Sequence, residues 1–337
     1  MPSDDLAALL RLAADADGMS RIEFRDPIAA HGSAAVAGLE DWLTDPRLGP
    51  FAVVTIKAAA LGGAAIEARA ALQRARPHVN PSVAGDIDRA LAAFPGSTRT
   101  TGTRTGRGLN GTPASALEVL HGLVRDWRKR GSPPQRAIKW RQADWTAAFP
   151  EHRDNLGRLP SSLDRDVVRR VASRAAKDPV EAEFAFLVVK AWGEGDNGYG
   201  PFRARKSLEV TSEPGARLMT AAQTLVGRGA VAAYERFSDR GDCRIFSLGP
   251  AFGTKFLYFC QPDDQRPRAL IHDTNVADWL RDNAGLSLPS ASWSVPRYRA
   301  YLAQMHLWAE DLDCSPDDVE LCMFRSVLGS ANQWNDG

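Results

Sequence analysis

The stretch FSLGPAFGTKFLYFC, residues 246–260, decides how this chain is interpreted. Gly249, Pro250 and Gly253 predict a tight turn between two apolar segments, because glycine and proline favour turn conformations. Glycine also lets the backbone approach a ligand closely, and amide groups at the start of the following helix can receive a phosphate. We therefore expect Gly249 and Gly253 to contact a bound phosphate group.

Lys255 is the residue of this stretch that could carry chemistry. Thr254 is expected to cap a helix that begins at FLYF, which places Lys255 in the first turn. The positive end of the helix dipole then favours the neutral amine, which can attack an electrophilic carbon and form a Schiff base. Without a partner residue, the same pattern would fit an ordinary exposed lysine.

A candidate partner follows eighteen residues later, in RALIHDTNVADWLRD. Asp273 comes after the apolar Leu270 and Ile271 and precedes a helix that is expected to begin near Asn275. Aspartate at a helix start is a common N-cap, and the amides it caps hold its carboxylate in place and ionised. One helix and one turn separate Asp273 from Lys255, so the two side chains could face the same cleft.

The turn that ends in lysine, with an aspartate at a later helix start, resembles the helix–hairpin–helix DNA glycosylases. Among them it is most similar to the bacterial 8-oxoguanine DNA glycosylases of the OGG fold group. The resemblance covers about residues 160–337 and includes AFLVVKAWGEGDNGYGPFRARKSL and YRAYLAQMHLWAEDLDCSPDDVELCMF. The turn itself, LGPAFG at residues 248–253, departs from the family's Leu-x-Gly-hydrophobic-Gly pattern.

The resemblance implies an all-α fold with a cleft between two helical subdomains. It implies that Lys255 attacks C1′ of a damaged nucleotide and that Asp273 assists, on double-stranded DNA that contains a modified base such as 8-oxoguanine. The base must first be flipped out of the duplex, because C1′ cannot be attacked while the nucleotide is stacked. The resulting imine would permit AP lyase chemistry, and no metal or other cofactor is required.

Further residues are candidates for contacts with DNA and with the flipped base. The segment 193–206 is expected to form a glycine-rich loop that contacts DNA or fills the gap left by the base, although it could also be a plain surface turn. The DNA-binding candidates are Gly249, Gly253, Thr254, Asn197, Tyr199, Arg203, Arg205 and Lys206. The candidates for the base pocket are Trp192, His306 and Trp308, although such aromatic residues more often pack in a core.

The charge of the chain is concentrated in its central part. The formal net charge is only +1, yet residues 95–170 contain 15 Lys/Arg and 7 Asp/Glu, a net charge of +8. Such a concentration suits contact with phosphates, and it equally suits a solvated basic segment. Basic residues there alternate with Trp127, Trp140 and Trp145, which predicts either a nucleic-acid surface or helices with tryptophans in the core.

The pattern along the chain predicts a mainly α protein with two domains. Residues 1–94 are expected to form an N-terminal all-α, HEAT-like module, which could bind a protein partner. Residues 95–114 are rich in Gly, Thr and Arg and are expected to form a flexible linker. Residues 115–337 are expected to form the glycosylase-like catalytic domain, with its core at about 160–337.

The start of the chain does not have the pattern of a secretory signal, and no apolar run is long enough to cross a bilayer. The four cysteines, Cys243, Cys260, Cys314 and Cys322, have no C-x-x-C spacing, so a zinc site is not expected. We expect a cytoplasmic, nucleoid-associated protein without membrane contact.

Three hypotheses follow for function. The first is a repair glycosylase, possibly with AP lyase activity, that removes an 8-oxoguanine-like base through Lys255 and Asp273. The second is a defence-type glycosylase that excises hypermodified bases from invading phage DNA, which the additional N-terminal module would suit. The third is a non-catalytic DNA-binding protein, which the presence of both Lys255 and Asp273 argues against.

Overall fold

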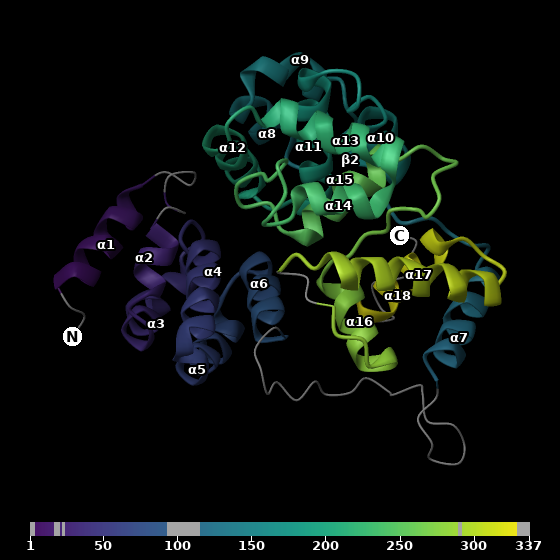
Figure 1. Ribbon diagram of the computed structural model, residues 1–337. Helices are drawn as coiled ribbons and strands as arrows, with labels where there is room; N and C mark the ends of the chain where they lie inside the picture. Colours follow the sequence, from purple (N-terminus) through teal and green to yellow (C-terminus); the bar gives the residue numbers. More distant parts are fainter. Residues whose placement is uncertain (1–3, 17–20, 22–23, 93–114, 289–291, 329–337) are drawn as a thin grey trace, which may run out of the picture. The chain divides into compact units, whose positions relative to one another are not determined.

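The computed structural model describes residues 4–16, 21, 24–92, 115–288 and 292–328 of the chain (Figure 1). These residues divide into two compact units, one within Met1–Thr105 and one within Gly106–Gly337. Both units consist mainly of helix, which confirms the predicted mainly α class. The expected linker, 95–114, lies outside the described residues. No described helix is both long enough and apolar enough to cross a membrane.

The first unit is built from short helices around α4 (Gly49–Ala59). Phe51, Val53 and Ile56 of α4 are buried against α2, α3 and α6, which explains the apolar run in this part of the sequence. The surrounding elements are α1 (Asp4–Asp15), α2 (Arg25–Ala29), α3 (Ser33–Leu39), η2 (Glu40–Thr44), η3 (Ala60–Ala64), α5 (Ala65–Ala75), η4 (Arg76–His78) and α6 (Pro81–Ala92).

The second unit contains longer helices and one very short antiparallel strand pair. Its elements are α7 (Ala116–Lys129), β1 (Ile138–Lys139), α8 (Gln142–Ala148), η5 (Pro150–His152), α9 (Arg153–Gly157), β2 (Ser162–Leu163), α10 (Arg165–Ala172), α11 (Pro179–Glu194), α12 (Gly200–Val210), α13 (Pro214–Arg228), α14 (Ala230–Phe237), α15 (Pro250–Cys260), α16 (Thr274–Ala284), α17 (Val295–Asp311) and α18 (Pro316–Leu328).

Helix α11 runs through the larger group of helices, α8 to α15. The carboxylate of Asp178 accepts a hydrogen bond from the Glu181 amide, and Pro179 occupies the first turn, where its missing N–H is not needed. The helix ends at Gly195, whose φ of 60° is accessible to glycine at little cost. Nearly all its side chains from Phe184 onward are buried, and α11 packs against α10, α13 and α15.

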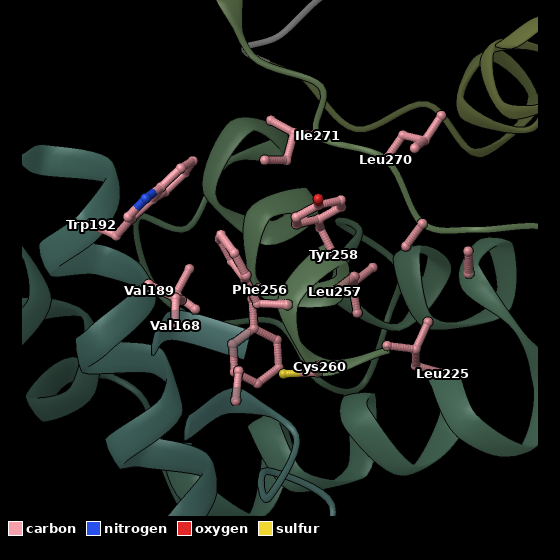
Figure 2. Packing of buried hydrophobic residues seen from close by; sticks show 14 of the residues in the cluster. Val168, Val189, Trp192, Leu225, Phe256, Leu257, Tyr258, Cys260, Leu270 and Ile271 are labelled. Atoms are coloured by element: carbon pink, nitrogen blue, oxygen red, sulfur yellow. The ribbon is translucent and has the colours of Figure 1, made fainter. Parts of the chain in front are cut away.

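Helix α15 is buried along most of its length. Figure 2 shows Phe256, Leu257 and Tyr258 of this helix packed among side chains from α10, α11, α13 and the segment that precedes α16. Trp192 of α11 meets the ring of Phe259 edge-on, with their centroids 5.0 Å apart. A helix enclosed on all sides in this way is held rigidly by packing.

The second group of helices, α16 to α18, packs together with α7 (Figure 1). Helix α7 begins with a capping box formed by Ser115 and Glu118. Its Trp127 is 7% exposed, while Trp140 and Trp145, in the larger group, are 6% and 0% exposed. The tryptophans of the basic central segment therefore belong to the core, which decides between the two interpretations of their pattern.

A buried polar cluster joins the two groups of helices. The Arg165 guanidinium of α10 lies 3.1 Å from a carboxylate oxygen of Glu320 on α18 and donates a hydrogen bond to the Tyr258 hydroxyl on α15. Burial raises the pKa of Glu320 to about 7, against the opposing influence of Arg165. The cluster connects α15 to both sides of the unit and so helps to fix the position of that helix.

Gly253 allows close packing onto α15, which yields a first prediction. A methyl group added there would lie 2.4 Å from the ring of Trp293, which itself packs edge-on against Tyr234. We expect Gly253→Ala to lower the free energy of unfolding by about 1–3 kcal/mol because the ring must move. Urea denaturation followed by circular dichroism measures this change.

The matched control for this variant is Gly122→Ala in α7, where an added methyl meets no atom within 4 Å. We expect this control to leave stability unchanged or raise it by about 0.5–1 kcal/mol, because alanine is the better helix former. Equal unfolding midpoints for Gly253→Ala and the wild type would contradict the packing of Trp293 on α15.

Candidate functional site

Lys255 lies inside α15, whose start differs from the prediction. The helix begins at Pro250, after Gly249 in an extended conformation, so Lys255 is in the second turn. The expected helix start at FLYF is therefore wrong, because Pro250 occupies the first turn, where its fixed φ and missing N–H suit a helix start. The helix dipole is therefore not expected to favour the neutral amine of Lys255, since the influence of the dipole fades beyond the first turn.

Asp273 is the N-cap of α16, as its sequence pattern predicts. One carboxylate oxygen, Oδ1, accepts hydrogen bonds from the amides of Asn275 and Val276, at 3.2 and 3.3 Å. The cap leaves the other oxygen, Oδ2, available to a different partner.

Lys255 and Asp273 meet in a largely buried ion pair. Lys255 Nζ lies 3.0 Å from Asp273 Oδ2, and the two side chains are 9% and 15% exposed. Burial alone would raise the pKa of Asp273. The Lys255 ammonium and the hydrogen bonds from Lys255 and the Val276 amide outweigh burial and lower that pKa. The carboxylate is therefore ionised at neutral pH.

Thr254 connects α15 to the segment that carries Asp273. Its hydroxyl is fully buried, donates to the Pro250 carbonyl at 2.8 Å and accepts from the His272 amide at 3.0 Å. The prediction that Thr254 caps the helix is wrong, because Gly249 holds that position and Thr254 lies within α15. Its expected contact with DNA stays a prediction. Its hydrogen bond to His272 instead holds the residue next to Asp273.

The chain just before Asp273 is fixed by buried hydrogen bonds. The Tyr298 and Tyr301 hydroxyls of α17 donate to the carbonyls of Leu270 and Ile271, at 3.2 and 2.8 Å. His272 is 1% exposed, and burial lowers its pKa to about 4, so its ring is neutral at pH 7. The segment that leads to Asp273 is thus fixed by hydrogen bonds to α15 and to α17.

The glycines predicted to bind phosphate have different positions. Gly249 is half-buried and precedes α15. No atom lies within 4 Å of the position that a Cβ atom would take there, so a ligand could approach the backbone. Gly253 lies within the helix, against the Trp293 ring, so it is not part of a tight turn. The predicted turn is therefore confined to the residues before Pro250.

The predicted DNA-contacting loop is shorter than expected. Residues 195–199 form a turn, but α12 begins at Gly200, which makes the second half of the segment helical. Asn197 and Arg203 both donate to the Glu194 carboxylate, and the Arg205 guanidinium donates to Glu209. Tyr199 lies in the turn and is half-buried, and Lys206 is exposed on α12.

The candidates for the base pocket are mostly core residues. Trp192 and Trp308 are 5% and 7% exposed, and Trp308 meets the Trp279 ring edge-on. His306 is half-buried and its Nε2 accepts a hydrogen bond from the Arg268 amide. Trp192 and Trp308 therefore pack in the interior, and their contact with a flipped base stays a prediction.

The sequence interpretation missed a second buried lysine beside Lys255. Lys190 of α11 is 6% exposed, and its Nζ lies 3.1 Å from the carboxylate of Glu194, one turn further along the helix. The sequence could have indicated this pair, because Lys190 and Glu194 are four residues apart in the otherwise apolar run FAFLVVKAWGE. Among the described residues, no three His, Cys, Asp or Glu side chains are grouped as metal ligands would be.

Comparison with known proteins gives one match. A family model described as "Putative 8-oxoguanine DNA glycosylase OGG-like protein" matches residues 131–324, a range that includes both Lys255 and Asp273. No curated protein and no solved structure gave a significant match to this chain.

The bond between Thr254 and His272 gives a second prediction. Thr254→Val has nearly the same shape but leaves the His272 amide buried without its partner, and we expect the free energy of unfolding to fall by about 1–3 kcal/mol. Thr254→Ser keeps the hydroxyl and is the control. If both variants unfold at the same urea concentration as the wild type, the hydrogen bond from the His272 amide to Thr254 does not stabilise the segment before Asp273.

Proposed function

Because this chain belongs to the family described as putative 8-oxoguanine DNA glycosylase OGG-like proteins, we propose that it removes a modified base resembling 8-oxoguanine from double-stranded DNA. In this proposal Lys255 is the nucleophile that attacks C1′ and Asp273 is its acidic partner. The observation that carries the proposal is the buried contact of 3.0 Å between Lys255 Nζ and Asp273 Oδ2.

The chemistry follows from the two side chains. The lone pair of the neutral Lys255 amine forms a bond to C1′ while the bond between C1′ and the base breaks, and the departing base takes up a proton. The ionised Asp273 carboxylate stabilises the positive charge that develops on the sugar and accepts the proton that the attacking amine loses. Two amides already fix this carboxylate, so it needs little reorganisation during the reaction.

An AP lyase step is a natural continuation of the same chemistry. Opening of the bond between C1′ and O4′ converts the adduct into an imine, and loss of a C2′ proton then expels the 3′ phosphate. The turn at residues 195–199 and the exposed Lys206 are candidates for contacts with the DNA around the extruded nucleotide. The first 94 residues, which lie outside the matched range, are a candidate docking site for a protein partner.

Borohydride trapping tests the proposal. We expect wild-type protein to form a covalent adduct with a duplex that contains 8-oxoguanine, because borohydride reduces the imine between Lys255 and the sugar. Lys255→Gln should form none. Asp273→Asn retains an oxygen for the helix cap and should slow adduct formation by about 10²–10⁴-fold. Gel electrophoresis of the trapped complex provides the measurement.

The control variant is Lys177→Gln, which removes an exposed lysine of the same unit and should leave the adduct unchanged. An adduct only with hypermodified phage-type bases would support a defence enzyme instead of a repair enzyme. DNA binding without an adduct or base release on any duplex would reject the enzymatic proposal and leave a binding protein.

A further inference from the structure

Lys190 is an unusual charge in the core of the second unit. Its ammonium lies 3.5 Å from the centre of the Phe252 ring and 3.1 Å from the Glu194 carboxylate, and its side chain is 7% exposed. Burial lowers the pKa of Lys190, although the Glu194 carboxylate opposes that effect. Glu194 therefore helps to keep a positive charge at a position where an unpaired ammonium would be costly.

The same aromatic ring connects Lys190 to Lys255. Lys255 Nζ lies 5.5 Å from the centre of the Phe252 ring, so both amines are close to one side chain of α15. Gly193 makes this arrangement possible, since a Cβ atom there would lie 2.5 Å from the Phe252 ring and 3.3 Å from the Lys255 side chain. The two lysines interact electrostatically across this contact.

A nucleophilic lysine beside a carboxylate presents a chemical problem. Attack on C1′ requires a neutral amine, whereas a neighbouring carboxylate in general favours the ammonium form of an amine. The helix dipole cannot supply the opposing influence, because Lys255 lies beyond the first turn of α15. A second positive charge nearby acts in the required direction, since like charges disfavour each other's protonated form.

We propose that Lys190 is a positioning residue that keeps the Lys255 amine reactive, by placing a second positive charge beside it across Phe252. Lys190 does not itself contact the substrate in this role. The importance of this effect for catalysis rests on the proposed glycosylase function, whereas the effect on the Lys255 amine does not.

Other charged groups around Lys255 are compatible with this role. Asp273 pairs with Lys255, and the neutral His272 precedes Asp273. On the side of Lys190, Glu194 of α11 pairs with Lys190 and also accepts a hydrogen bond from Arg203 of α12. Further away, Glu320 of α18 interacts electrostatically with Asp273, and Arg165 of α10 pairs with Glu320. Glu194 is shared between Lys190 and Arg203, so these three side chains together carry a net positive charge.

The pH dependence of Lys255 acylation tests the proposal without requiring any enzyme activity. Trace acetic anhydride is applied to the full-length protein between pH 6 and pH 11, and mass spectrometry measures the acylation of Lys255. Lys190→Met removes a positive charge near Lys255. We expect this change to raise the pH midpoint of Lys255 acylation by about one pH unit. The midpoint should stay at the wild-type value in Lys190→Arg, which keeps the charge.

Lys177, which is exposed, is the internal reference and should keep its midpoint in every variant. If Lys190→Met does not fold, Lys190→Gln takes its place, because its amide can still donate to Glu194. Equal midpoints for Lys255 in the wild type and the neutral variant would overturn the proposal. An equal upward shift in Lys190→Arg would also overturn it, because packing rather than charge would then be responsible.

Borohydride trapping over the same pH range separates this inference from the proposed function. If wild-type protein forms the adduct, trapping by Lys190→Met should begin at a higher pH than trapping by the wild type, in step with the acylation midpoint of Lys255. If the acylation midpoint rises but the pH at which trapping begins does not, the charge of Lys190 has no influence on catalysis. A complete lack of adduct with wild-type protein would reject the glycosylase proposal, and the acylation result would still decide the role of Lys190.

Discussion

The C-terminal unit depends on the buried contact between Lys255 and Asp273. Both side chains lie largely inside the protein, where loss of one partner from an ion pair costs about 3–5 kcal/mol. The fold must therefore bring the amine and the carboxylate to within hydrogen-bond distance and hold them there. They come from different groups of helices, so the segment between α15 and α16 has to be fixed as well. Tyr298 and Tyr301 donate hydrogen bonds to carbonyls of this segment, and Thr254 accepts one from its His272 amide, which together meet that requirement.

The packing around α15 explains how a charge can be held inside an apolar helix. Two glycines give neighbouring rings access to the backbone: Gly253 accepts the Trp293 ring, and Gly193 of α11 accepts Phe252. The centre of the Phe252 ring lies 5.5 Å from Lys255 Nζ, and the Lys255 side chain is buried except for 9% while its amine reaches Asp273. The pair is thus held by packed helices, and the Lys255 amine and the Asp273 carboxylate have little freedom to move away from each other.

Sequence patterns predicted the features that depend on local structure. Asp273 was predicted as a helix cap from its place between an apolar pair and a helix, and a glycine-rich loop was predicted from residue 193, next to the end of α11 at Glu194. The start of α15 and the burial of Thr254 were missed, since both depend on contacts with distant residues. Lys190 was missed for the same reason: a lysine in an apolar run becomes informative only when Phe252 and Glu194 are seen around it.

The two oxygens of Asp273 show why an ordinary helix cap can also serve chemistry. A cap fixes the carboxylate through Oδ1, and this bonding leaves Oδ2 oriented toward Lys255 without a further residue to position it. Lys255 and the Val276 amide both favour the ionised form of the carboxylate. The start of α16 therefore holds one oxygen of the acid in place and leaves the other in contact with the amine. Lys190, whose ammonium lies at the same Phe252 ring as Lys255, is the second cation that we propose acts on this pair.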